Sequence, residues 1–360
     1  MTVLNGVADD VNSKEDRPVG SRRPKPPKPV PAPPGALSIF HEPWWLDIAA
    51  GGGWAEVRVE RGGSVLGRMP YCVGRRRPFL TSTMPPMVRT LGPWIGTSGS
   101  NPSVDLRNRL GVADELIAQL PDFVHFVQML DPRIDEAIAF DQRGYDVSVG
   151  YTFWIERDRN KDAVWAGMRD KTRNLIRRAG EQLTVRRVDD ARAFSDFYGG
   201  NLDARQLANV YDPGLMLRLI DAALTREAGC VLGAFDRDGE PAAMAVVVWD
   251  SHAAYYLLSS RKQQVHSGAV SLLVWEAIQI ALQKGLVFDF DGFAGETGLA
   301  FVTGFGGALK PRFVVKRTRP WYAAMRAAGQ RVTGRGRPPK PAKGRDPTPP
   351  AGADAAGGRS

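Results

Sequence analysis

The segment KDAVWAGMRDKTRNLIRRAGE, residues 161–181, carries the clearest helical pattern in the chain. We predict that it forms one continuous helix that buries its apolar face against the rest of the protein. The apolar side chains recur at the spacing of a single helix face, and they are Trp165, Met168, Leu175, Ile176 and Ala179.

Three arginines follow the edge of that face. Arg169, Arg173 and Arg177 are four residues apart, so a continuous helix places them in one column. Like charges at this spacing repel each other by a few tenths of a kcal/mol, whereas guanidinium groups bind phosphate oxygens through paired hydrogen bonds. The column is therefore a candidate substrate-binding site for an anionic group. The alternative is a solvated basic face.

The same segment resembles a known family. Its pattern is similar to the signature helix of FemABX-like proteins and of the BioF2-like (CelD-type) acetyltransferases, both branches of the GNAT superfamily. The resemblance implies two GNAT-like domains and the transfer of an acyl or aminoacyl group to an amine. The residues that carry it are Trp165, Thr172, Arg173, Asn174, Ile176, Arg177, Arg178 and Ala179.

The two ends of the chain differ in composition from the middle. Residues 1–36 contain eight prolines between Pro18 and Pro34, and the C-terminal end is similarly rich in proline, glycine and basic residues. We therefore expect disordered tails at 1–36 and 329–360. Between them we expect an α/β (α+β) fold of two tandem GNAT-like domains, 37–155 and 156–328, with mixed, largely antiparallel sheets.

Most of the net positive charge belongs to the tails. Residues 1–36 contribute +2 and residues 331–360 contribute +5 to the total of +9, which leaves +2 for the residues between them. The high pI is therefore no evidence for a nucleic-acid-binding fold.

Several function classes are not expected. Cys72 and Cys230 form no metal or disulfide pattern with each other or with the histidines. The first 16 residues contain no apolar core of signal-peptide length, so we expect a reduced, cytoplasmic protein. The apolar segment 267–285 is too short for a membrane span and carries Glu276, so we expect a buried helix. The sequence indicates no particular oligomeric state.

In the first half, an apolar, proline-rich segment at 78–96 predicts an ordered loop, and its Arg89 is a candidate substrate contact. The alternative for Arg89 is a surface arginine. A short helix starting near Pro43 should place Trp44, Trp45 and Ile48 toward a core. Further strands are expected at 54–60, 64–71, 123–129 and 145–155, with a helix at 104–121.

The second half alternates strands and helices. A strand at 183–188 and helices at 190–205 and 213–227 precede a meander of strands at 230–236, 241–250 and 252–260. The helix at 267–285 and a strand at 286–291 follow. In the family that the chain resembles, this order of elements is the core of a GNAT domain.

The loop before the apolar helix partly matches the GNAT motif Q/R-x-x-G-x-G/A, whose backbone amides hold the pyrophosphate of coenzyme A. The resemblance implies that the loop binds the donor, although Ser267 stands where the motif has its first glycine. A Ser N-cap of the helix is the alternative explanation of Ser267. The candidate donor-binding residues are Gln264, His266, Ser267, Gly268 and Ala269.

The segment 288–311 also resembles FemABX proteins, in their D-F-x-G strand end and their F-K-x-x-F-G run. Val302 stands where the family has a lysine that belongs to the site of its tRNA-dependent members. This departure favours an acyl-CoA donor.

Three carboxylates near this segment are candidate catalytic bases, namely Asp289, Asp291 and Glu296. Asp289 and Asp291 are expected on the same face of a strand. Two neighbouring carboxylates raise each other's pKa, which suits a base that removes a proton from an ammonium group. The alternative is that they cap the glycine turn.

We therefore predict an N-acyltransferase that binds a small-molecule acyl donor, with acyl-CoA as the expected donor, and an amine acceptor, with no permanently bound cofactor and no metal. One alternative is a FemABX-type transferase that uses aminoacyl-tRNA, the only case in which a nucleic acid is a partner. Another is a catalytically inactive GNAT-like binding scaffold.

Overall fold

The computed structural model describes residues 37–76, 78–97, 101–293 and 295–332. The predicted tail at 1–36 and most of the predicted tail at 329–360 lie outside these ranges. Helix α10 (Pro320–Val332) includes residues 329–332, which were expected to belong to the C-terminal tail. In the described part, no helix is long and apolar enough to cross a bilayer.

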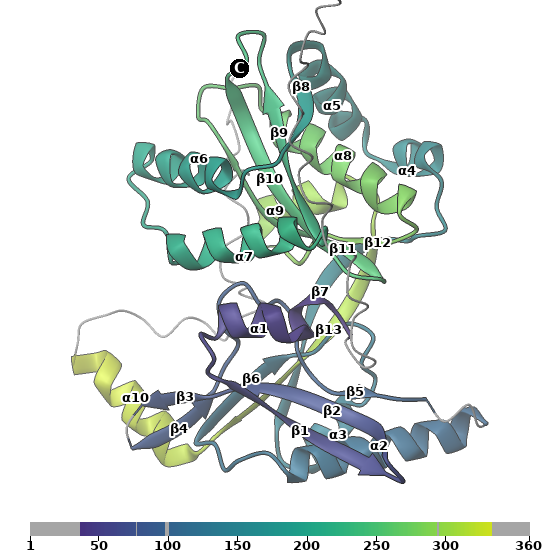
Figure 1. The fold of residues 1–360 in the computed structure, drawn as a ribbon, viewed down its shortest axis with the longest axis vertical. Coiled ribbons are helices and arrows are strands. Elements are labelled where there is room, and N and C mark those ends of the chain that lie inside the picture. Colours follow the sequence, from purple (N-terminus) through teal and green to yellow (C-terminus); the bar gives the residue numbers. More distant parts are fainter. Residues whose placement is uncertain (1–36, 77, 98–100, 294, 333–360) are drawn as a thin grey trace, which may run out of the picture.

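The main sheet has ten strands and confirms the mixed, largely antiparallel α/β class (Figure 1). Two neighbouring pairs, β4–β6 and β11–β12, are parallel, and the other pairs are antiparallel. In spatial order the strands are β3 (Gly74–Arg76), β4 (Phe79–Ser82), β6 (His125–Met129), β13 (Ala308–Thr318), β7 (Asp146–Ile155), β12 (Val287–Asp289), β11 (Ala253–Arg261), β10 (Pro241–Trp249), β9 (Gly229–Phe235) and β8 (Thr184–Val188).

Helices cover both faces of the β8–β12 half. Side chains of β10 alternate between the two faces, with Ala245 in one apolar core and Val246 in the other. The first core includes α4 (Lys161–Gly167), α5 (Asp170–Gln182), α8 (Ala269–Gln283) and α9 (Gly295–Thr303). The second includes α1 (Pro43–Ala49), α6 (Ala191–Ala204) and α7 (Pro213–Thr225).

The other half has a second, smaller sheet. Strands β1 (Trp54–Arg61), β2 (Ser64–Cys72) and β5 (Trp94–Ile95) form it. The turn between β1 and β2 contains Gly62 and Gly63 at φ values of 57° and 78°, as a tight hairpin turn requires. Helices α2 (Pro102–Ala118) and α3 (Ala137–Gln142) contribute to the core of this half.

The two halves exchange elements. Strand β13 comes from the end of the chain but pairs with β6 and β7, and Figure 1 shows β7 and β13 running through both halves. Conversely, α1 comes from the start of the chain but buries Trp45 and Leu46 in the core that contains α6 and α7. The division at residue 155 therefore does not separate the sheet into independent units.

The predicted helix 161–181 is two helices, which corrects the expectation of one continuous helix. Helix α4 ends at Gly167, and Met168 and Arg169 are extended before α5 begins at Asp170. The Arg169 N–H donates to the Gly304 carbonyl over 3.0 Å instead of to the preceding turn. A contact with a distant segment therefore breaks a helix that the local sequence pattern continues.

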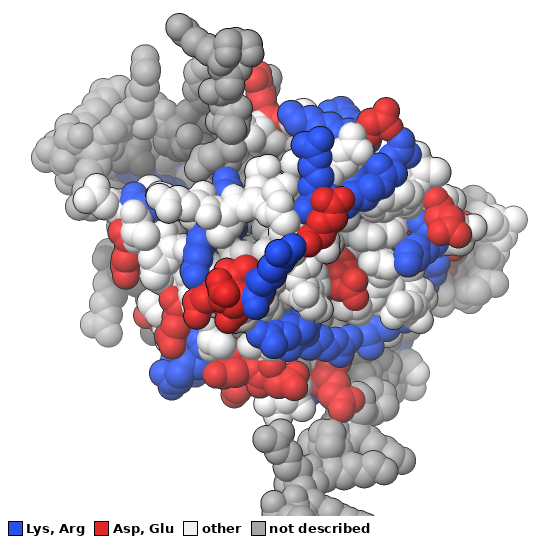
Figure 2. All heavy atoms as spheres, turned by 90° about the horizontal axis from the view of Figure 1, so that it is seen from above, with Lys and Arg blue, Asp and Glu red and all other residues white. Residues whose placement is uncertain are grey.

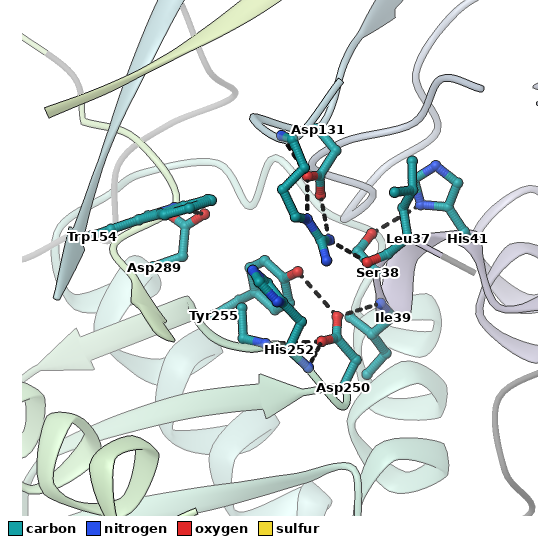
Figure 3. Close-up of polar contacts among 12 residues, drawn as sticks. Leu37, Ser38, Ile39, His41, Asp131, Trp154, Asp250, His252, Tyr255 and Asp289 are labelled. Carbon is teal, nitrogen blue, oxygen red and sulfur yellow. Dashed lines mark hydrogen bonds and ion pairs between the residues drawn. The ribbon is translucent and has the colours of Figure 1, made fainter. Parts of the chain in front are cut away.

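Residues 37–41 connect the two halves through buried polar contacts (Figure 3). The Ile39 N–H donates to the Asp250 carboxylate over 2.9 Å, and the Tyr255 hydroxyl donates to the same carboxylate over 3.0 Å. From the other half, the Arg133 guanidinium donates to the Leu37 carbonyl and pairs with Asp131. The short segment is thus held by charged groups of both halves.

His41 in this junction makes the stability of the protein depend on pH. Burial lowers the pKa of His41 from 6.5 to about 4, so the folded protein keeps it neutral, with its Nδ1 near the Ser38 hydroxyl. The unfolded chain binds the proton more readily, so the contribution of His41 is lost as the pH falls from 6.5 towards 4.

We expect the free energy of unfolding of the wild type to fall in that window more steeply than that of His41→Gln, by about 1.4 kcal/mol per pH unit. Urea denaturation at several pH values measures both slopes. Burial raises the pKa of Asp250, which acts in the opposite direction, but this group is present in both proteins. Equal slopes would contradict the prediction.

Candidate active site

The site lies where β11 and β12 separate. The two strands pair in parallel for three residues, from Ala253 opposite Val287 to Tyr255 opposite Asp289. Beyond Tyr255, β11 continues to Arg261 beside β10, whereas β12 ends. The β10–β11 register shifts between Tyr256 and Leu258, so Leu257 is the extra residue of a β-bulge. The bulge and the strand ends form a break in the sheet.

Arg89 bridges this break. Its Nη2 donates to the Leu257 carbonyl over 2.9 Å, and its Nε lies 2.6 Å from the Asp291 carboxylate. If the β11–β12 register continued, Leu257 would stand opposite Asp291. The guanidinium thus connects the two chain segments where strand pairing stops.

The loop that carries Arg89 is ordered and buried, as predicted. Leu91 makes a parallel bridge with Leu130, and Met87 adopts a φ of 61°, a rare conformation for this residue type. Arg89 is only 6% exposed, so the alternative of a surface arginine is wrong. Its role as a substrate contact stays a prediction.

Asp289 and Asp291 do not share a strand face as expected, because β12 ends at Asp289 and Asp291 lies beyond the strand. Asp291 has a φ of 56°, which turns the chain after β12, and its carboxylate lies between Arg89 and Arg312 of β13. The Arg312 Nη1 is 3.4 Å from it, and both arginines are buried. Asp291 is therefore the centre of an ion-pair cluster that joins three distant segments.

Asp289 has a different environment. It accepts hydrogen bonds from the Thr152 hydroxyl over 2.5 Å, from the Trp154 indole over 2.8 Å and from the Asp291 N–H over 2.7 Å. Figure 3 shows the Trp154 ring next to this carboxylate. Burial raises the pKa of Asp289. The raised pKa thus comes from burial and not from a second carboxylate.

Two residues of α9 that were singled out from the sequence differ in their exposure to solvent. Glu296, in the first turn of α9, is exposed, whereas Val302, the residue in place of the family lysine, is 4% exposed and belongs to the core. The structure therefore gives Val302 a packing role.

The predicted donor loop leads into α8. Gly268, and not Ser267, is the N-cap of α8, so the alternative explanation of Ser267 is wrong. The Gly268 N–H donates to His266 Nδ1 over 3.0 Å, while Gln264 and Ser267 are exposed. Ala269 is the first residue of the helix and is buried.

Gly268 allows α8 to approach α5. A Cβ atom at this position would lie 2.4 Å from the Leu175 carbonyl oxygen, a backbone atom that cannot rotate away. We expect Gly268→Ala to destabilise the protein by about 1–3 kcal/mol, the usual cost of overpacking. Urea denaturation measures it.

Gly111→Ala is the matched control, since a Cβ there meets nothing within 4 Å and the residue lies in α2. It should stabilise by about 0.5–1 kcal/mol. A Gly268→Ala variant as stable as the wild type would show that α5 and α8 are not held at this distance.

The predicted arginine column is only partly present. Arg169 is the N-cap of α5 and has an extended backbone, so it does not belong to the helix that carries Arg173 and Arg177. The Arg173 guanidinium donates to the Ala166 carbonyl over 3.0 Å and pairs with Asp170, so it caps the end of α4. Arg177 donates to Asn174 Oδ1 over 3.0 Å and lies over the Trp165 ring.

These contacts favour a structural role for Arg173 at the corner between α4 and α5. Seen from the end of the molecule where α5 lies in Figure 1, basic and acidic side chains are intermixed and form no single positive face (Figure 2). An anion site at these arginines stays a prediction.

Four residues that surround Asp289, Asp291 and Arg89 were not predicted from the sequence. Arg312 follows a proline in a strand of no distinctive pattern, and Thr152 and Trp154 lie in an ordinary strand. The Tyr211 hydroxyl oxygen accepts a hydrogen bond from Arg89 Nη1 over 3.4 Å. Only Trp154 could have been suspected from the sequence, because it is an aromatic residue near the end of a predicted strand. Many core residues share that feature, so it does not identify a site.

The chain resembles known proteins in part of its sequence and in its fold. Residues 166–298 match the family model described as an acetyltransferase (GNAT) domain. A search of curated proteins found no match. Among solved structures, FemX superposes with a TM-score of 0.61 at 15% identity, covering 79% of this chain and 93% of that chain.

Two further structures give lower scores. L-PGS from Bacillus licheniformis has a TM-score of 0.46 at 12% identity, covering 79% of this chain and 90% of that chain. A tandem GNAT protein from the clavulanic acid biosynthesis pathway has 0.42 at 14% identity, covering 76% and 93%. The chain therefore has a fold similar to that of FemX, and its residues 166–298 match a GNAT acetyltransferase domain.

Proposed function

We propose that this protein is an N-acyltransferase that transfers an acyl group from acyl-CoA to an amine. The observation that carries the proposal is the break between β11 and β12 inside the matched GNAT domain, with the start of α8 following β11. An acyl group bound beside that break would lie next to the β11 backbone and the Arg89 guanidinium, which spans from Leu257 to Asp291.

The donor is proposed to bind along the loop before α8. A helix N-terminus and exposed loop amides attract phosphate groups, and residues 264–267 are accessible or partly accessible there. In this proposal Gln264, His266 and Ser267 contact the phosphates or the adjoining pantetheine. Gly268 and Ala269 set the position of the helix end.

The acceptor reacts by direct attack. The nitrogen lone pair forms a bond to the acyl carbonyl carbon, the carbon–sulfur bond breaks, and coenzyme A leaves as the thiol after taking up the proton that the nitrogen loses. Backbone N–H groups near the bulge are proposed to stabilise the negative charge that develops on the carbonyl oxygen. Asp289, whose pKa is raised by burial, is the carboxylate best suited to accept the proton first.

Isothermal titration of the full chain with acetyl-CoA and longer acyl-CoAs tests the donor. Heat of binding with at least one of them is expected, and no heat with any of them removes the donor from the proposal. Thiol release in the presence of a panel of amines then identifies the acceptor.

The proposed base is tested with that assay. Asp289→Asn should lower the rate by about 10²–10⁴, while Asp238→Asn, in the exposed turn between β9 and β10, should leave it unchanged. If Glu296→Gln lowers the rate and Asp289→Asn does not, the base lies on α9.

Aminoacyl transfer from tRNA is the second candidate, favoured by the likeness of the fold to that of FemX. It predicts that charged tRNA binds to the full chain and to the chain without its two tails. Binding that disappears with the tails would remove this candidate.

A further inference from the structure

Helix α10 presents apolar side chains to solvent. Trp321 is 50% exposed and Met325, one turn later, is 44% exposed. The helix is held on its other side by Tyr322, which is 3% exposed and lies against the Phe79 ring at 5.5 Å and the His125 ring at 6.3 Å. One face of α10 is thus docked on the protein, and an apolar part of it is not.

The sequence around this helix is strongly basic. From Arg319 to Arg345 there are eight Lys/Arg and no Asp/Glu, whereas the whole chain has 48 Lys/Arg and 39 Asp/Glu. Arg326 is exposed on α10 itself. Arg319, just before the helix, pairs with Asp122 over 2.5 Å, so one positive charge of this stretch is neutralised.

Strand β3, which is far away from α10 in the sequence, also carries arginines. Residues 75–77 are three consecutive arginines, and the first two belong to β3, the end strand of the main sheet. Its hairpin partner β4 starts with Phe79, whose ring is 5.2 Å from that of Trp321. Figure 1 shows α10 next to β3 and β4.

We propose that α10 and the β3–β4 hairpin bind the surface of an anionic lipid bilayer. A helix with an exposed Trp and Met on one side and basic residues around it is typical of segments that lie in the headgroup region. Trp321 and Met325 would enter the boundary between headgroups and acyl chains, and Arg326 would contact lipid phosphates.

The exposed apolar pair distinguishes this partner from a nucleic acid. A site for RNA or DNA phosphates needs the basic residues but gains nothing from a methionine side chain exposed one turn from the tryptophan. A lipid surface uses both features, because apolar burial and charge attraction act together there. The proposal is independent of the acyltransfer reaction.

Co-sedimentation of the full chain with vesicles tests the proposal. We expect binding to vesicles of phosphatidylcholine mixed with phosphatidylglycerol, weaker binding at high salt, and little binding to phosphatidylcholine alone. The double variant Trp321→Ser/Met325→Ser should bind at least about tenfold more weakly, because the inserted apolar area is lost. Met325→Ser alone, which leaves the aromatic contacts of Trp321 intact, should weaken binding in the same direction.

The matched control is Val104→Ser/Leu106→Ser on α2, where two apolar residues are similarly exposed at 48% and 42%. It should bind like the wild type. Equal binding by the α10 double variant and the wild type, or no binding to the anionic vesicles, overturns the proposal. So does binding of poly-uridylate without binding of the vesicles, which would assign the surface to nucleic acid.

Discussion

Arg89→Ala is expected to destabilise the protein by about 3–5 kcal/mol, the usual cost of removing one partner of a buried ion pair. The Arg89 and Asp291 side chains are 5% and 4% exposed, so the variant leaves a buried carboxylate with one guanidinium fewer. It also removes the hydrogen bond to the Leu257 carbonyl. Urea denaturation followed by circular dichroism measures the loss.

An exposed ion pair provides the control for this variant. Arg61 pairs with Glu115, and these side chains are 62% and 46% exposed. Arg61→Ala should therefore cost less than about 1 kcal/mol. If Arg89→Ala costs no more than this control, Arg89 does not hold the break between β11 and β12.

Trp45→Ala is expected to cost about 3–5 kcal/mol, because it removes a large side chain that is 0% exposed. The indole packs edge-on to Phe40 at 5.4 Å and lies in the core formed with α6 and α7. The start of the chain thus completes the core of the half that contains the GNAT domain. The same denaturation measurement applies.

Trp44 is the matched control in the same helix. It is partly buried, and the Arg226 guanidinium lies 4.7 Å from its ring centre. Trp44→Ala should cost about 1 kcal/mol, of the order of an exposed cation–π contact. Equal losses for the two variants would show that α1 is only attached to the surface of this core.

Much of the strand and helix pattern follows from local sequence. The β1–β2 hairpin was predicted because Gly62 and Gly63 allow its turn, and the β9–β11 meander because short polar turns separate apolar runs. The helix at 161–181 was predicted as one, since its apolar period continues through Met168. The break follows from the Gly304 carbonyl, which no local pattern indicates.

The site was only partly predictable for the same reason. Asp289 was found as a carboxylate on the predicted strand at 286–291, but the partners of Asp291 are Arg89 and Arg312, which are 202 and 21 residues away. Their meeting depends on β13 crossing into the other half and on the 78–96 loop folding back to β11. The periodicity of apolar residues predicts which face of a helix or strand is buried. It does not predict which distant segments of the two halves come into contact.

Hydrogen–deuterium exchange of the full chain, with and without saturating coenzyme A, tests the central claim most directly. If the donor binds where β11 and β12 separate, exchange should slow in peptides covering 255–272 and 287–293 and stay unchanged in the β1–β2 hairpin. Protection confined to other segments, or none anywhere despite saturation, would contradict the proposed position of the donor.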